Sequence, residues 1–181
     1  MHGATGWHRP VAGTFGGWVK VRHLLLAVAA LALLTGWARY PQPSNGAPFA
    51  EARFTGVGNG GELFTAYRSG ICTVPGTTLA MFRPTQRKPV DLRLVPGERI
   101  YIRAVFQAMA GSNMTVHGTE YLSRHCNSGA SFVPVSGHRY AIDHRVSDTT
   151  CGIVIVDADT GVPPDTYSPE KLPAPCDRPL W

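Results

Sequence analysis

The chain has 181 residues, of which 44% are hydrophobic and 16% charged, a composition typical of one globular domain and unlike that of a disordered chain. Its net charge of +5 raises the question of nucleic-acid binding. However, Arg9, Lys20 and Arg22 precede the first acidic residue, Glu51, and the chain from Arg39 onward carries fourteen Lys and Arg against twelve Asp and Glu. No cluster of basic residues matches a row of phosphates, so we expect no nucleic-acid binding.

An apolar segment near the N-terminus has the length of a signal sequence. Leu24–Leu34 holds eleven apolar residues, whereas a membrane-spanning helix needs about 20. Basic residues precede it, and the small residues Gly36 and Ala38 fit a signal-peptidase site. We therefore predict a signal peptide over residues 1–38 and a periplasmic or secreted protein, which would touch a membrane only if this segment stays uncleaved as an anchor. A start near Val19 would give a more compact signal.

The remaining sequence predicts an all-β protein. A linker at 39–52 precedes an antiparallel β-sandwich at 53–160, and a Pro-rich tail at 161–181 contains Cys176. Gly and Pro separate short apolar runs at the spacing of a sandwich with seven or eight short strands. The expected strands are 62–69, 78–83, 90–95, 99–106, 114–122, 131–134, 139–146 and 150–157. We expect no helix longer than three turns after Pro41.

A weak internal repeat marks two hairpins. Val95-Pro-Gly-Glu-Arg-Ile-Tyr-Ile and Val135-Ser-Gly-His-Arg-Tyr-Ala-Ile share a turn whose glycine, Gly97 or Gly137, suits positive φ, followed by an alternating strand. The opposite faces of these strands, which carry Arg103 and Arg139, should be wet. Cys151–Val156 is apolar on both faces and should lie centrally. The core residues predicted from this alternation are Ile100, Ile102, Phe106, Tyr140, Ile142, Ile153 and Ile155.

Four cysteines lie after the signal segment, without the close spacing of a zinc site. An even number in an exported chain predicts two disulfides, for which three pairings are possible. We favour Cys126–Cys151 together with Cys72–Cys176, because the second bond would tie the Pro-rich tail to the body. A reactive thiol is the alternative, but no paired histidine is evident in the sequence beside any cysteine.

The segment from Val95 to Asp157 resembles small exported proteins and lipoproteins of proteobacteria, most of them of unknown function. The resemblance rests on the Pro96-Gly97 turn, Cys126, the spacing of Phe132, Pro134, Gly137 and Tyr140, and the strand Cys151-Gly-Ile-Val-Ile-Val-Asp157. It implies a bacterial envelope β-sandwich and no catalytic activity. Trp37 stands where a lipoprotein would have its lipidated cysteine.

Motifs for catalysis or metal binding are weak. Asp157-Ala-Asp159-Thr-Gly161 begins like a calcium loop, but Ser168 stands where the loop's glutamate would be, and an ordinary turn explains the residues. His138 and His144 share a strand face but lie about 20 Å apart. No nucleophile elbow, HExxH or P-loop is present. We expect neither cofactor nor metal, and whether the protein is an enzyme stays open, with binding favoured.

Arginine outnumbers lysine, and Arg103, Arg124, Arg139 and Arg145 could line an anionic groove, although a solvated sheet face is the favoured explanation. Tyr101, Arg103, Arg139 and Arg145 are the candidate binding residues. We expect a non-enzymatic cell-envelope module that binds a protein or an envelope polymer. The alternatives are a secreted hydrolase inhibitor and a hydrolase. An exposed, cysteine-pinned loop with a protruding apolar or acidic residue would favour the inhibitor, and a concave pocket that gathers two or more of His117, His125, His138 and Asp157 would favour the hydrolase.

Overall fold

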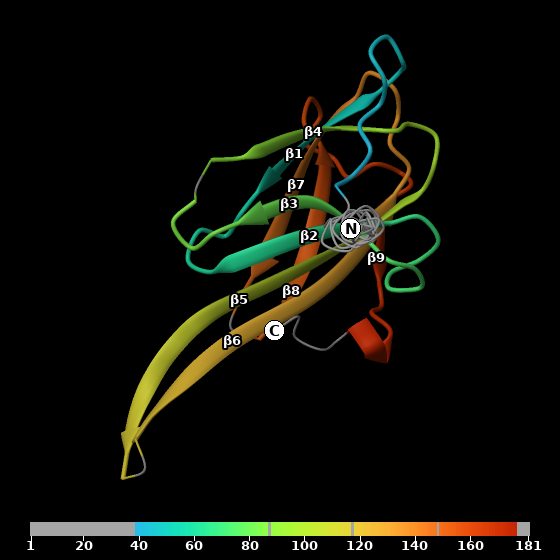
Figure 1. Ribbon diagram of the computed structural model, residues 1–181. Helices are drawn as coiled ribbons and strands as arrows, with labels where there is room; N and C mark the ends of the chain where they lie inside the picture. The colour runs from blue at the N-terminus through green and yellow to red at the C-terminus, as the bar shows by residue number, and fades with distance from the viewer. Residues whose placement is uncertain (1–38, 87, 117, 148, 177–181) are drawn as a thin grey trace, which may run out of the picture. The chain divides into compact units, whose positions relative to one another are not determined.

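The computed structural model describes residues 39–86, 88–116, 118–147 and 149–176, and these form a β-sandwich of two sheets (Figure 1). The predicted signal segment, His117 and the last five residues lie outside the described part. The four-stranded sheet has the order β4-β1-β7-β8, and the five-stranded sheet has the order β3-β2-β5-β6-β9. The strands are β1 (Ala50–Thr55), β2 (Gly61–Tyr67), β3 (Thr77–Phe82), β4 (Val90–Leu94), β5 (Ile100–Thr115), β6 (Gly118–Phe132), β7 (Arg139–Val146), β8 (Cys151–Asp157) and β9 (Ser168–Glu170).

The predicted all-β class is confirmed, and so is the expected scarcity of helix. The described residues after Pro41 contain a single helical element, the short 3-10 helix η1 (Ala174–Cys176). No described helix is long and apolar enough to cross a membrane.

The core lies between the inward faces of the two sheets. Because successive side chains of a strand point to opposite faces, each strand contributes alternate residues to it. The rings of Phe54 and Phe64 meet edge to face at 5.2 Å, and those of Phe132 and Tyr140 at 4.9 Å. All seven predicted core residues are buried: Ile100, Ile102, Phe106, Tyr140, Ile142, Ile153 and Ile155.

Three strand assignments from the sequence need correction. β1 begins at Ala50, inside the segment expected to be a linker, and it pairs in parallel with β7 and antiparallel with β4. β8 is an edge strand rather than a central one. At this edge the Tyr167 hydroxyl of the tail donates to the Ile153 carbonyl at 2.8 Å. β9 lies within the expected tail and pairs with β6.

The largest departure is the length of β5 and β6. Both continue past the sandwich as a two-stranded ribbon, and the predicted strand at 114–122 in fact spans the turn between them (Figure 1). β2 pairs with β5 only as far as Gln107, whose partner on β6 is His125. We call residues 108–124 the β5–β6 arm. Among the described residues, no third strand pairs with it.

The two disulfides are the favoured pair, Cys72–Cys176 and Cys126–Cys151, and no described cysteine is free. The first bond ties the tail to the loop after β2. The second joins β6 of one sheet to β8 of the other, with the Cα atoms 6.2 Å apart. Two disulfides fit an oxidising location outside the cytoplasm.

The predicted repeat also has the expected geometry. Gly97 and Gly137 have φ of 82° and 78°, a conformation that favours glycine. The two turns lie close together, since the Gly97 amide donates to the Pro134 carbonyl at 2.9 Å.

Candidate functional site

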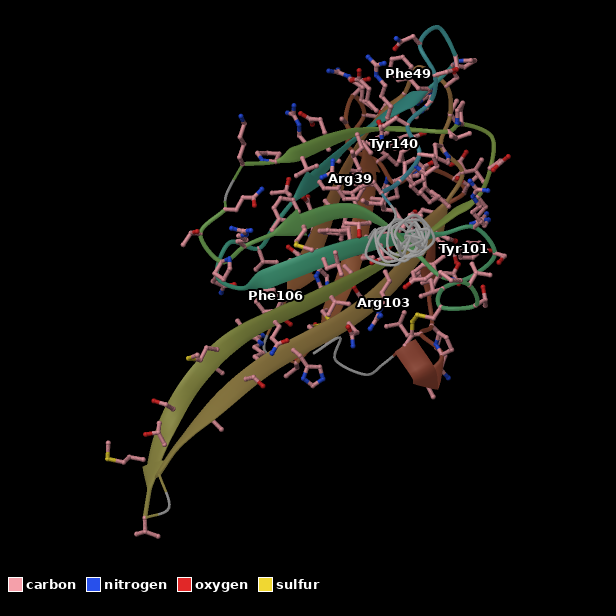
Figure 2. All side chains as sticks on the ribbon, in the orientation of Figure 1. Arg39, Phe49, Tyr101, Arg103, Phe106 and Tyr140 are labelled. Carbon is pink, nitrogen blue, oxygen red and sulfur yellow. A yellow bond between two sulfur atoms is a disulfide. The ribbon has the colours of Figure 1, made fainter. Side chains whose placement is uncertain are left out.

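The structure places two of the predicted binding residues on the outer face of the five-stranded sheet. Tyr101 is half-buried and packs beside Tyr67, Ile71 and the Cys72–Cys176 bond. Arg103 is only 4% exposed, so the prediction of a wet face here is wrong (Figure 2). Its guanidinium donates to the Asn127 side-chain oxygen at 3.4 Å. The sequence shows the alternation of β5 but does not show that Ile71 of the loop after β2 and Leu172 of the tail pack over Gly129, the β6 partner of Arg103.

Arg139 and Arg145 lie on the opposite side of the sandwich. They are exposed on the outer face of β7, where inward Tyr140, Ile142 and His144 alternate with them. Arg139 forms an ion pair with Asp159. The four candidates therefore form two separate pairs and do not line one groove.

His138 and Asp157 form a hydrogen bond of 2.8 Å beside a cavity of about 370 Å³. Both residues were named as members of a possible hydrolase pocket, and their contact depends on how β7 meets the end of β8, where Tyr140 pairs with Asp157. The bond from His138 lowers the pKa of the Asp157 carboxyl, and the backbone N–H groups of Thr160 and Asp159 lower it further. Oδ1 of Asp157 accepts both of these N–H groups, which is the arrangement of a turn and confirms that interpretation of 157–161.

His138 and Asp157 both line this cavity, so two of the four residues named as marks of a hydrolase pocket come together. Within the described residues, no serine, threonine or cysteine side chain is hydrogen-bonded to His138. A nucleophile held by such a bond is what a histidine–aspartate pair needs for acyl transfer. His125 lies elsewhere, on β6 opposite Gln107.

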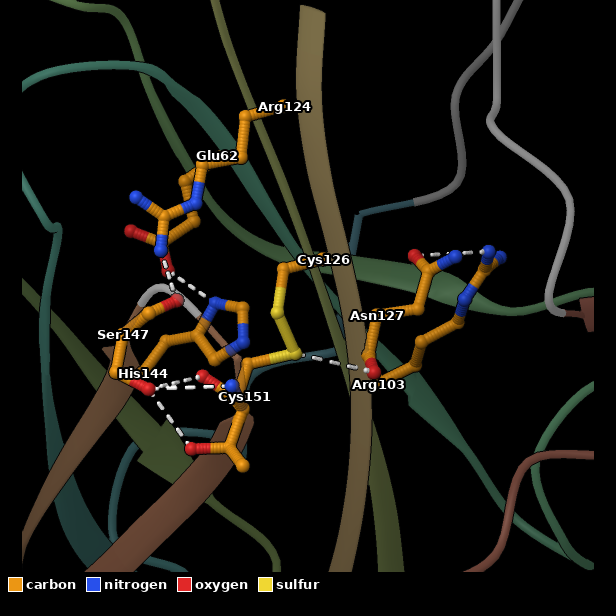
Figure 3. The surroundings of a disulfide bond; sticks show 9 residues. Glu62, Arg103, Arg124, Cys126, Asn127, His144, Ser147 and Cys151 are labelled. Carbon is orange, nitrogen blue, oxygen red and sulfur yellow. Dashed lines mark hydrogen bonds and ion pairs between the residues drawn. A yellow bond between two sulfur atoms is a disulfide. The ribbon is translucent and has the colours of Figure 1, made fainter. Parts of the chain in front are cut away.

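A second histidine–carboxylate pair lies inside the sandwich. His144 of β7 and Glu62 of β2 come from different sheets, and His144 Nδ1 lies 2.7 Å from Glu62 Oε1 (Figure 3). Their side chains are 0% and 1% exposed. The other Glu62 oxygen accepts the Val57 N–H at 3.0 Å. Glu62 was not among the predicted site residues, although it is the one charged residue in the strand Gly61–Tyr67 and was a usable signal.

The same histidine lies beside the Cys126–Cys151 disulfide. One ring nitrogen of His144 and the two sulfurs all lie within 4.8 Å of one another (Figure 3). This corrects the expectation that no histidine accompanies a cysteine. The neighbours are 18 residues and 7 residues away along the chain, so only the fold brings them together.

The β5–β6 arm carries the most exposed apolar side chains of the described chain. Met109, Met114 and Val116 are 73%, 90% and 97% exposed, and Leu122 is also exposed. A β-bulge between Met109 and Gly111 shifts the register by one residue. As a result Met109, opposite Ser123, and Met114, opposite Thr119, lie on the same face of the ribbon.

Comparison with known proteins gives no further guide to function. The chain matches no family profile, no curated protein and no solved structure.

Proposed function

We propose that this protein is an exported, non-enzymatic cell-envelope module that binds another protein through the β5–β6 arm. The observation that carries the proposal is the exposure of Met109, Met114 and Val116 on a ribbon that extends beyond the sandwich (Figure 1). Export is supported by the apolar segment at Leu24–Leu34 and by the two disulfides.

The arm is costly to leave in water. A two-stranded ribbon is marginally stable by itself, and burial of one large apolar side chain contributes roughly 1.5–3 kcal/mol. Soluble proteins protect open strand edges with charges, prolines or a covering segment. Residues 108–124 contain no proline and only two formal charges, those of Glu120 and Arg124. A partner that covers the arm would bury its exposed apolar side chains and its open strand edges.

The shape of the arm indicates the kind of partner. The arm is a protrusion, so its complement is a concave, apolar surface. Met109 and Met114 share one face, and methionine adapts to an irregular apolar surface because its side chain is flexible and polarizable. We therefore propose a protein groove lined by apolar side chains, which fits this surface better than a highly hydrated envelope polymer.

A secreted inhibitor of a hydrolase is the second candidate, and a specific observation favours it. Cys126 lies two residues beyond the arm on β6, and its disulfide to Cys151 fixes the root of the arm to the other sheet. A segment whose root is fixed loses less entropy when it enters a cleft. In that case the partner's groove would be an active-site cleft.

A cross-linking experiment tests the proposal. A photoactivatable residue would replace Thr119, which is exposed beside Met114, and in a second protein it would replace Met81, which is exposed on β3. After export in the native host, we expect a heterologous cross-linked product from position 119 and none from position 81. Mass spectrometry would identify the partner and the cross-linked surface.

Matched substitutions make the result specific. Met109→Ser combined with Met114→Ser should abolish the product, whereas Val162→Ser, which changes an exposed apolar residue in the tail, should leave it intact. Equal products from both positions, or a product insensitive to the methionine changes, would overturn the proposal. A product that contains only this chain would show that the groove belongs to a second copy.

A further inference from the structure

His144 is buried between the Glu62 carboxylate and the Cys126–Cys151 disulfide, and a disulfide does not need such a histidine–carboxylate pair beside it. Nδ1 of this buried ring lies at 2.7 Å from the Glu62 carboxylate, which can only accept, so Nδ1 carries the hydrogen. In the neutral ring, Nε2 then holds the lone pair. Nε2 is inaccessible to solvent and has no hydrogen-bond partner among the described residues. An unpartnered buried acceptor is unfavourable and calls for an explanation.

One ring nitrogen of His144 forms a cluster with the two sulfurs of Cys126 and Cys151, and Figure 3 shows that the nitrogen not bonded to Glu62, which is Nε2, lies on the side of the ring toward the disulfide. A histidine that binds a metal usually gives its other N–H to a carboxylate, which fixes the tautomer and orients the ring. Glu62 and His144 have that arrangement. Two thiolates and one imidazole are a ligand set that favours Zn²⁺.

We propose that reduction of the Cys126–Cys151 disulfide converts this cluster into a Zn²⁺ site, with Cys126, Cys151 and His144 as ligands and Glu62 as the residue that positions His144. The site takes a water molecule or an external ligand as its fourth partner. Two thiolates balance the charge of the ion, so the centre adds no net charge to a partly buried region.

Reduction frees the two bonded sulfurs to separate, which binding one ion requires. Zn–S and Zn–N distances are about 2.3 and 2.0–2.1 Å, which places tetrahedral ligand atoms about 3.5–3.8 Å apart. The three ligand atoms already lie within 4.8 Å of one another. The cysteines come from β6 and β8, so the ion would take over the link between the two sheets that the disulfide makes.

The redox step balances with an external dithiol. The disulfide accepts two electrons and two protons and becomes two thiols, while the dithiol loses the same electrons and protons and closes its own disulfide. Zn²⁺ then displaces the two thiol protons into solvent. In an oxidising compartment the disulfide form persists, so the metal form is confined to reducing conditions.

The test uses full-length protein in which Cys72→Ser and Cys176→Ser leave only the Cys126–Cys151 pair. A phosphine reductant, which becomes a phosphine oxide, avoids a competing dithiol ligand. We expect the reduced protein to bind one Zn²⁺ per chain and the oxidised protein to bind none. Co²⁺ in place of Zn²⁺ should give the thiolate charge-transfer and visible bands of a tetrahedral site.

Three variants decide which residues bind. In the same background, Glu62→Gln should weaken Zn²⁺ binding about 10–100-fold, as expected for a residue that orients a ligand. His144→Gln should weaken it further and change the Co²⁺ spectrum. Chains with Cys126→Ser and Cys151→Ser, which keep the other cysteine pair, serve as the control and should bind no Zn²⁺ at this affinity.

Circular dichroism of each reduced variant verifies that the β-sandwich persists. Zn²⁺ binding by the Cys126→Ser/Cys151→Ser protein equal to that of the test protein would overturn the proposal. So would an unchanged affinity and Co²⁺ spectrum in a folded His144→Gln protein. If the His144→Gln protein does not fold, the result is decided by the Zn²⁺ affinity of the Glu62→Gln protein and by the comparison of the two proteins that keep different cysteine pairs. An unchanged Zn²⁺ affinity in the Glu62→Gln protein would reject the positioning role of Glu62.

Discussion

Glu62 and His144 are 82 positions apart in the sequence, and their backbones belong to different sheets. Their side chains nevertheless meet inside the core, with Nδ1 of His144 at 2.7 Å from Oε1 of Glu62. Glu62 comes from β2 and His144 from β7, so the bond joins the two sheets in the same region as the Cys126–Cys151 disulfide. Buried polar groups that are hydrogen-bonded in this way hold two surfaces in one register, and they are expensive to break.

Glu62→Gln should lower the free energy of unfolding by about 1–3 kcal/mol. The carboxylate accepts both the His144 ring N–H and the Val57 N–H, whereas a glutamine side chain has one acceptor oxygen and can satisfy only one of them. Urea denaturation would measure the change. Glu51→Gln, at an exposed carboxylate on β1, is the control and should stay within about 0.5 kcal/mol of the wild type. Equal effects in both variants would contradict the role of Glu62.

Each disulfide should contribute several kcal/mol, and the bond that closes the longer loop should contribute more. In the chain-entropy model, closing the loop between residues 126 and 151 contributes about 3.5 kcal/mol, and the 104-residue separation of Cys72 and Cys176 about 4.7 kcal/mol. Paired Cys→Ser variants would be compared by urea denaturation. Titration of the unreduced, denatured protein should find no reactive thiol. Two thiols per chain would contradict the pairing.

Stability should fall in acid partly because of Asp157. Its pKa in the folded protein is lowered, first by the His138 hydrogen bond and then by the backbone N–H groups of Thr160 and Asp159. The folded state therefore binds fewer protons than the unfolded chain. The stabilisation is complete above the unfolded value, about 3.9, and is lost as the pH falls through the lower folded value.

Asp157→Asn should therefore flatten the decline in unfolding midpoint between about pH 5 and pH 2. Asp165→Asn, at an exposed position in the tail, is the comparison and should leave the pH profile unchanged. A profile for Asp157→Asn that coincides with the wild type would show that the carboxyl does not contribute.

Two adjacent glycines should respond differently to alanine. A Cβ on Gly60 would lie 2.5 Å from both the Gln107 carbonyl oxygen and the buried ring of Phe106, whereas a Cβ on Gly61 would meet nothing closer than 3.9 Å. Gly60→Ala should therefore cost about 1–3 kcal/mol through overpacking, and Gly61→Ala much less. Thermal unfolding of the two variants would test this difference. Equal midpoints would mean that the chain before β2 moves away freely.

If the protein is exported as proposed, its mature form should begin at Arg39. N-terminal sequencing of the mature form would test cleavage after Ala38. An intact N-terminus together with membrane association that resists carbonate extraction would instead establish the signal-anchor alternative.

The sequence predicted the strands whose alternation is clean and whose turns need glycine. Tyr140, Ile142 and the turn at Gly137 all lie where the period of two places them. Prediction from the sequence failed where segments distant in the chain decide whether a strand face is buried or where a strand lies in its sheet. Arg103 looked solvated by alternation, but Ile71 and Leu172 pack over Gly129, its partner on β6, and β8 looked central although it is an edge strand.

The candidate site was less predictable than the fold, because its contacts cross between sheets. Nothing local to His144 indicates Glu62 or the Cys126–Cys151 bond, since these residues come from β2, β6 and β8. The exposure of the β5–β6 arm was not predicted for another reason. The sequence of the arm alternates like that of a strand, and alternation does not reveal whether a second sheet packs against the strand.

The position of Cys126 determines how the arm carries mechanical load. The cysteine lies two residues beyond the arm, and its covalent partner lies on the other sheet. If a partner binds the arm as proposed and pulls on it, tension along β6 reaches this bond before it reaches the β6–β9 pairing at residues 129–131. The force is then shared by both sheets as shear, which opposes many hydrogen bonds at once, and the strands are not peeled apart one bond at a time. Reduction of the same bond would let the ribbon unzip from its root.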